Sequence, residues 1–230
     1  MRVLICIPCL LTGGTEIQTL NLVEALIRGG HQVTTVCYFE HTPNMVSRYQ
    51  QAGSKVVCLS VTGKRIGGIN GIIFLYKGLK QMIRISKPDI THVQYMAPGA
   101  IPILLLRLFG IKNIIATAHT ADIYPNLKLV HFIQRYCVRV FTCITQVAEM
   151  SFFGKSNLYT QKTVIQKVNH FTIYNVLPSY IKIREEQRDF SSPVTLGVVG
   201  RLEKIKGGDL VIPAFVRIKE RYPETRLLIV

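Results

Sequence analysis

Short, unbroken runs of apolar residues alternate along the chain with longer segments whose apolar positions recur every three or four residues. Arg2–Pro8 is the first such run, and His31–Tyr38 is the second. Between them, 15–28 places Ile17, Leu20, Val23, Leu26 and Ile27 on one helical face, and Gly29 and Gly30 follow. An apolar strand, an amphipathic helix and a second apolar strand form a βαβ unit with a right-handed connection. The pattern therefore predicts an α/β fold with a Rossmann-like parallel sheet.

The same alternation continues to the end of the chain. Further strands are expected at 55–59, 89–94, 113–118, 140–145, within 162–173, at 194–199 and at 225–230, and further helices at 43–53, 71–86, 99–109, 126–139, 146–153 and 208–221. The polar, charged segment 180–193 ends at a proline, which is typical of an interdomain linker. We therefore expect an N-terminal domain over 1–179, a linker over 180–193 and the start of a second domain over 194–230.

Composition narrows the classes of partner. A hydrophobic fraction of 48% excludes disorder, and a net charge of +15 calls for an acidic partner such as a phosphate-bearing substrate, an anionic membrane surface or a nucleic acid. We expect no nucleic acid, because no zinc-finger, homeodomain or RNP-type motif is present. The longest apolar run, 97–111, is interrupted by Arg107 and is too short to span a bilayer. We expect a cytoplasmic protein, and docking at the inner face of a membrane is compatible with that location.

Basic residues gather on the expected helix 71–86. Lys77, Lys80 and Arg84 are three and four residues apart, so they share one face. Two interpretations stay open: a solvated face of a covering helix, or a surface that docks on anionic lipid.

The six cysteines have no disulfide-framework spacing, which indicates reduced thiols. Cys6 and Cys9 form a C-x-x-C pair, but Cys6 falls inside a strand rather than at a helix start, so redox chemistry is not expected. The histidines other than His119 form no pair with metal-ligand spacing, and we expect no metal site.

The stretch 194–210 predicts an anion site. A buried strand ends at Gly200, Arg201 and Lys206 follow, and a helix opens at Gly207 and Gly208. A helix N-terminus offers backbone N–H groups and a positive dipole end, and the two cations add full charge for a ligand such as a diphosphate. The alternative is an ordinary strand–turn–helix with two solvated cations.

Two further candidates follow strands of the N-terminal domain. Gly13 and Gly14 lie between the first strand and its helix, where they allow a ligand to approach the backbone closely, although the segment is not the G-x-G-x-x-G dinucleotide fingerprint. His119 follows the strand expected at 113–118, at the edge where open α/β sheets bind ligands. A satisfied structural histidine is the alternative there.

These stretches together resemble the family 4 glycosyltransferases. The matching elements are G-R-L-x-x-x-K-G at 200–207, G-G-x-E at 13–16, T-x-H at 117–119 and an asparagine at Asn175. The resemblance implies a GT-B fold and retaining transfer of a sugar from a nucleotide-sugar to a polysaccharide or lipid-linked glycan, without a metal or other cofactor. It also implies that Arg201 and Lys206 hold the diphosphate, that Gly13 and Gly14 contact the donor through the backbone, and that His119 positions the sugar.

The sequence departs from the family pattern in two places. Val176 stands where the family has glycine after the asparagine, and the family's donor-contacting E-x7-E motif, which lies further along the second domain, is not reached by this sequence. We therefore expect a truncated second domain and weak or no transfer by this chain alone. The alternative is a non-catalytic remnant, or half of a split glycosyltransferase that needs a partner chain.

Overall fold

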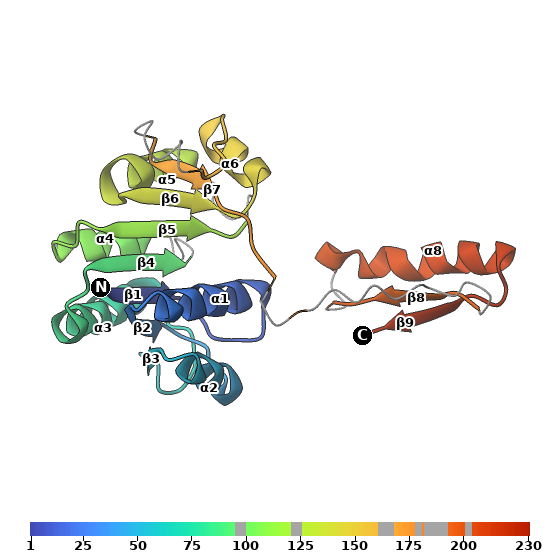
Figure 1. Cartoon of the computed structure of the whole chain (residues 1–230), viewed down its shortest axis with the longest axis horizontal. Helices are drawn as coiled ribbons and strands as arrows, with labels where there is room; N and C mark the ends of the chain where they lie inside the picture. The colour runs from blue at the N-terminus through green and yellow to red at the C-terminus, as the bar shows by residue number, and fades with distance from the viewer. Residues whose placement is uncertain (95–99, 121–125, 161–167, 178–180, 182–192, 201–203) are drawn as a thin grey trace. The chain divides into compact units, whose positions relative to one another are not determined.

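The computed structural model of the chain describes residues 1–94, 100–120, 126–160, 168–177, 181, 193–200 and 204–230. The chain divides into two compact units, Met1–Pro178 and Ser179–Val230 (Figure 1).

Unit 1 is built on a seven-stranded parallel sheet with the strand order β3-β2-β1-β4-β5-β6-β7 (Figure 1). This order reverses direction between β1 and β4, as in Rossmann-like sheets. The predicted α/β fold is therefore confirmed. The strands are β1 Arg2–Ile7, β2 Gln32–Cys37, β3 Lys55–Cys58, β4 Ile90–Gln94, β5 Ile114–Ala118, β6 Val140–Cys143 and β7 His170–Thr172.

Helices connect successive strands and cover both faces of the sheet. Threonine caps begin two of them, since Thr42 and Thr145 accept hydrogen bonds from backbone N–H groups of the first turn. The helices of unit 1 are α1 Gly14–Arg28, α2 Pro43–Gln51, α3 Gly68–Ser86, α4 Ile101–Leu108, α5 Leu127–Phe132 and α6 Gln146–Phe153.

Alternate residues of each strand enter two separate cores. On β1, Leu4 and Cys6 pack with α3, α4, α5 and α6, whereas Val3, Ile5 and Ile7 pack with α1 and α2. Each strand of a parallel sheet has two buried faces, which is why β1 reads as a continuous apolar run rather than an alternating one.

One expected helix is shorter than predicted. The segment 126–139 was expected as a single helix, but α5 ends at Phe132 and a π-helical turn follows at Ile133–Cys137. Val138 is then extended and leads into β6. Ile133 and Cys137 are both buried, so the wider turn keeps their side chains in the core although the α-helical hydrogen-bond pattern has stopped.

A buried carboxylate fastens the last strand of the sheet. Glu149 of α6 is fully buried and accepts hydrogen bonds from His170 Nδ1 and Thr172 Oγ1 of β7, each at 2.6 Å. The backbone N–H of Asn157 donates to the same carboxylate at 3.0 Å. A buried polar group is tolerated only when it is hydrogen-bonded, and these bonds join α6, the following loop and β7.

Unit 2 is a single βαβ arrangement. Strands β8 Thr195–Val198 and β9 Arg226–Ile229 pair in parallel, and a 3-10 turn at Lys204–Lys206 precedes helix α8 Gly208–Arg221. Helix α8 has no buried residue.

Candidate functional site

The candidate site of unit 1 lies at the carboxyl ends of β1, β4 and β5. Adjacent strands β1 and β4 run parallel, and their connections leave toward opposite sides of the sheet. Such a reversal opens a crevice outside the strand ends, and ligands bind there in open α/β sheets. The loop containing Gly13 leaves β1 and His119 follows β5, so the fold brings two predicted candidates to one edge.

The glycine loop after β1 is shaped by the side chain of Glu16. Gly13 is the N-terminal cap of α1 and has extended backbone angles, with no side-chain cap. A Cβ at Gly13 would collide with the carboxylate of Glu16, whereas a Cβ at Gly14 would meet nothing within 4 Å. A side chain at Gly13 would therefore displace the carboxylate of Glu16, and Gly14 leaves open space beside the first turn of a 15-residue helix.

A cavity of about 560 Å³ lies along the face of β4, β5 and β6. Its walls come from the sheet, from α1 and from the segment that follows β7, and they include His92, Gln94, Thr117, His119 and Thr142. This volume is in the range of small-molecule sites. The polar side chains are concentrated toward the carboxyl ends of the strands, which is where the glycine loop also lies.

Two hydrogen-bonded groups line the cavity. His119 Nε2 lies 2.8 Å from Gln94 Oε1, and because an amide oxygen only accepts, Nε2 carries the proton. His92 Nε2 lies 2.7 Å from Thr117 Oγ1, which lies 2.7 Å from Thr142 Oγ1. Gln94 Nε2 is buried and has no partner among the described residues. An unpaired buried donor is costly, so this amide is available to a ligand acceptor.

Both histidines are uncharged at neutral pH. Burial lowers the pKa of His119 to about 4, and burial followed by repulsion from His119 lowers the pKa of His92 to about 4. His119 is therefore a neutral hydrogen-bonding group at pH 7 rather than a cation.

The segment after β7 is held against α1. Gln18 of α1 makes two backbone contacts with Val176, donating to its carbonyl at 3.0 Å and accepting from its N–H at 3.3 Å. Asn21 donates to the same carbonyl at 3.4 Å. Asn175 lies among the cavity-lining residues beside this contact. Val176, which stands where the family has glycine, is thus fixed through its backbone.

The predicted anion site of unit 2 is described in part. Lys206 ends the 3-10 turn and is exposed, and Gly207 caps α8 with φ 73°, a left-handed conformation that favours glycine. Asp209 lies in the first turn of α8. Arg201 lies outside the described residues. The roles predicted for Gly13, Gly14, His119, Arg201 and Lys206 stay predictions.

The family is decided by sequence comparison. Residues 12–148, more than half of the chain, match the sequence profile described as Glycosyltransferase Family 4. The chain belongs to glycosyltransferase family 4. The matched range contains Gly13, Gly14, Gln94 and His119. Comparison with curated protein sequences gives no significant match.

Solved structures agree on the fold at low identity. The chain is similar to a glycosyltransferase from Rickettsia africae ESF-5 (TM-score 0.62, 11% identity, 99% of this chain and 68% of that one). It is similar to Anabaena Alr3699/HepE in complex with UDP (TM-score 0.61, 14% identity, 100% of this chain and 69% of that one). It is also similar to a UDP-GlcNAc 2-epimerase from Neisseria meningitidis bound to UDP-GlcNAc (TM-score 0.58, 11% identity, 100% of this chain and 65% of that one). The expected GT-B architecture is thus confirmed, and the chain spans about two thirds of these proteins' lengths.

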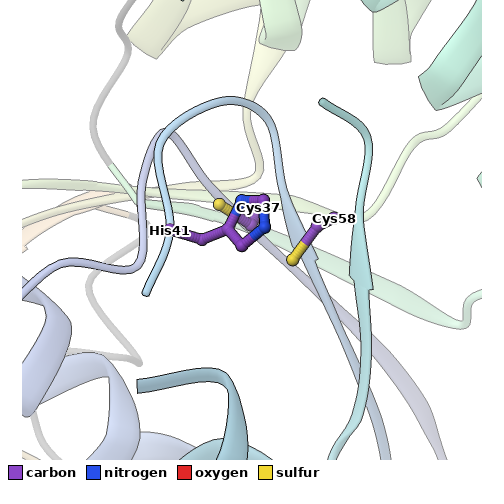
Figure 2. Close-up of side chains that lie close together, drawn as sticks. All are labelled: Cys37, His41 and Cys58. Atoms are coloured by element: carbon purple, nitrogen blue, oxygen red, sulfur yellow. The ribbon is translucent and has the colours of Figure 1, made fainter. Parts of the chain in front are cut away.

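Sequence reasoning missed three features of this family 4 chain. Gln94 and the cavity carry no motif, because they arise from the pairing of β4 with β5. The third feature is a group formed by Cys37, His41 and Cys58, whose ligand-type atoms all lie within 4.8 Å of one another (Figure 2). Cys58 is distant in sequence from the other two, so only the strand pairing of β2 with β3 could have indicated the group.

Two of the remaining thiols, those of the C-x-x-C pair, have raised pKa values. All six cysteines are free. Burial raises the pKa of Cys6 to about 12, and burial together with the neighbouring Glu16 raises the pKa of Cys9 to about 12.

Among the described helices, none is long and apolar enough to cross a membrane.

Proposed function

We propose that this chain takes part in retaining transfer of a sugar from a nucleotide-sugar to a polysaccharide or lipid-linked acceptor, without a catalytic metal ion. The observation that carries the proposal is the convergence of the Gly13–Gly14 loop and His119 on one edge of a family 4 sheet. A neutral histidine and an unpaired amide of Gln94 are suited to the hydroxyl groups of a sugar, which both donate and accept hydrogen bonds.

In this proposal residues of unit 2 bind the diphosphate and residues of unit 1 orient the sugar. The bond from the anomeric carbon to the diphosphate oxygen breaks, and negative charge develops on the departing diphosphate. Arg201, Lys206 and the N-terminus of α8 stabilise that charge. An acceptor hydroxyl oxygen forms the new bond on the same face of the sugar, and its proton leaves to the departing phosphate or to water. His119 and the backbone at Gly14 orient the sugar.

Binding of nucleoside diphosphates to the full chain tests the anion site. We expect Arg201→Ala and Lys206→Ala each to weaken binding of the preferred diphosphate by roughly 10- to 150-fold, since a charge-assisted hydrogen bond contributes about 1.5–3 kcal/mol. Lys204→Ala is the matched control, because Lys204 is exposed in the same 3-10 turn. Calorimetric titration measures all three variants. Equal losses in all three, or no loss in any, would refute the assignment.

A second candidate function is that of a half-enzyme or non-catalytic remnant that needs a partner chain. Unit 2 leaves large apolar side chains exposed on its helix, on β9 and directly after its two strands: Val199, Leu210, Ile212, Val216, Leu228 and Val230. Exposed apolar patches of this kind mark surfaces that another protein part covers. On this candidate the chain alone turns over little nucleotide-sugar.

Hydrogen exchange distinguishes the two candidates. If unit 2 needs a covering partner, amides of α8 and β9 in the isolated chain exchange far faster than those of β1 and β4. Robust sugar transfer by the purified chain, with α8 as protected as β1, would rule out the half-enzyme.

A third part of the proposal concerns the membrane. Lys77, Lys80 and Arg84 are exposed on α3, and the ammonium group of Lys80 lies over the ring of Tyr76 and donates to its hydroxyl at 3.3 Å. Exposed apolar side chains adjoin these cations on the same helix: Ile69, Ile72, Ile73 and Ile85. Cations beside apolar side chains are suited to an anionic bilayer surface, where a lipid-linked acceptor would lie.

A further inference from the structure

Three side chains with metal-binding chemistry converge at the carboxyl ends of β2 and β3. Cys37 is the last residue of β2, Cys58 is the last residue of β3, and His41 lies in the connection between them (Figure 2). Cys37 and Cys58 are direct partners in the parallel register of the two strands. The sheet itself therefore places the two sulfur atoms side by side.

The backbone orients the histidine for coordination. His41 Nδ1 lies 3.1 Å from the carbonyl oxygen of Phe39. A carbonyl oxygen only accepts, so Nδ1 carries the proton and Nε2 carries the lone pair. Metal-ligating histidines usually donate their other ring N–H to a carbonyl or carboxylate in this way, because it fixes the tautomer and the ring orientation.

We propose that Cys37, His41 and Cys58 form a binding site for a thiophilic divalent ion of the zinc class. Two sulfur ligands and one imidazole favour such an ion over magnesium or calcium, which prefer oxygen ligands. In a tetrahedral zinc site the ligand atoms are roughly 3.5–3.8 Å apart, given Zn–S and Zn–N bonds of about 2.3 and 2.0 Å. The two sulfur atoms and a ring nitrogen of His41 already lie within 4.8 Å of one another, so side-chain adjustment of about 1 Å brings the ligand atoms to these separations.

Binding has a defined proton balance. The Cys37 and Cys58 thiols each release a proton to solvent when their sulfur atoms coordinate, and neutral His41 contributes its lone pair without losing a proton. Three protein ligands leave the fourth tetrahedral position to water or to an external ligand. His41 and Cys58 are half-buried, which gives an ion access to the site, whereas Cys37 is buried.

The position of the site indicates a structural effect rather than a part in sugar transfer. Strand β3 is an edge strand of four residues that pairs only with β2 among the described strands. An ion would join the ends of β2 and β3 and the connection between them. None of its three ligands lines the cavity beside His119, so loss of the ion is not expected to remove a group that contacts the donor.

A disulfide between Cys37 and Cys58 is the competing explanation for the same geometry. Neighbouring strands place Cα atoms within the range that a disulfide spans. A disulfide would consume both sulfur ligands and leave His41 without a role. The two explanations therefore predict opposite results for metal binding and for free-thiol content.

The test uses the full chain, purified with a non-thiol reductant and freed of metal by a chelator. Zinc is added at known concentrations and the bound ion is counted by elemental analysis after gel filtration, and cobalt(II) serves as a spectroscopic probe for thiolate coordination. We expect one ion per chain, thiolate-to-cobalt charge-transfer absorption, and a higher melting temperature with zinc than without it. Cys58→Ser and His41→Ala are the test variants, because both side chains are half-buried and their loss spares the core.

Cys9→Ser and His31→Ala are the matched controls, since each removes a partly buried residue of the same type outside the group. We expect both test variants to bind zinc at least about tenfold more weakly than the parent chain, because losing even a residue that only hydrogen-bonds to a metal ligand can weaken binding by that factor. Both controls should bind zinc as the parent chain does. The proposal is overturned if the reduced chain binds no zinc, if the test variants bind as well as the controls, or if a separate preparation purified without reductant contains a Cys37–Cys58 disulfide.

Discussion

Acid should destabilise unit 1 through two buried histidines that stay neutral in the folded chain. The pKa of His92 and that of His119 are both lowered to about 4 by burial, whereas an unfolded histidine titrates near 6.5. Below pH 6.5 the unfolded chain binds protons that the folded chain does not. The contribution of these histidines to the free energy of unfolding is therefore fully present above pH 6.5. It decreases as the pH drops and stops decreasing near pH 4.

The size of the pH-dependent loss in unfolding free energy follows from the shift in the histidine pKa. A difference of about 2.5 pKa units corresponds to roughly 3 kcal/mol for either ring, with a slope of about 1.2 kcal/mol per pH unit near pH 5. Because repulsion between the rings contributes to the shift of His92, the two effects do not simply add. Even one such contribution is a large part of the stability of a small domain.

Urea unfolding at pH 7, 6 and 5 measures the effect. We expect His119→Gln and His92→Gln each to flatten the dependence of the unfolding free energy on pH, while His31→Gln, at a partly exposed position, leaves it unchanged. Carboxylates that titrate in the same range contribute equally to the pH dependence of every variant, so their contribution cancels when the variants are compared. The reasoning is wrong if both test variants keep the full slope of the parent chain, or if NMR titration of the two rings gives pKa values near 6.5.

Three other predictions concern packing and surface charge. Glu149→Ala should lower the unfolding free energy in urea by about 3–5 kcal/mol, because it leaves His170 and its neighbours without their acceptor, and Glu149→Gln should cost less. Gly13→Ala should cost about 1–3 kcal/mol in thermal unfolding through collision with Glu16, whereas Gly14→Ala should be nearly neutral, and equal effects would contradict the described loop. Reversing the charges of Lys77, Lys80 and Arg84 should weaken binding to anionic vesicles, measured by sedimentation, by at least about 150-fold, because losing three cations at roughly 1 kcal/mol each gives that factor and the new acidic groups add repulsion, while the same reversal at exposed Lys55, Lys112 and Lys155 should change it far less.

The sheet could be predicted from the sequence because its strands are buried on both faces. Runs such as Arg2–Ile7 have no other stable arrangement in a chain of alternating apolar and amphipathic segments. The turn at Ile133–Cys137 could not be predicted in the same way. Its apolar spacing is compatible with a continuing α-helix, and the change to π-helical hydrogen bonding depends on how those side chains meet the core.

The site was predictable only where a residue follows its own strand. His119 lies directly after an apolar run and Gly13 lies in the loop that follows one, so their edge of the sheet follows from the βαβ rule. Gln94 is inside the expected strand 89–94, and its contact with His119 depends on the register of β4 against β5. Glu149 reads as an ordinary surface residue of a short helix, yet it is fully buried, because three partners from later in the chain surround it.

The fold alone does not decide the chemistry, because a glycosyltransferase and a UDP-GlcNAc 2-epimerase are both similar to this chain over at least 99% of its length. Family membership favours transfer, and the site then limits how the proposed transfer could work. Since the pKa of His119 is about 4, its imidazole does not supply positive charge at pH 7, and the proposal therefore assigns stabilisation of a departing diphosphate to Arg201, Lys206 and backbone N–H groups. His119 is left with orientation of the sugar through hydrogen bonds. It follows that protonation of His119 should not shape the dependence of transfer on pH between 6 and 8.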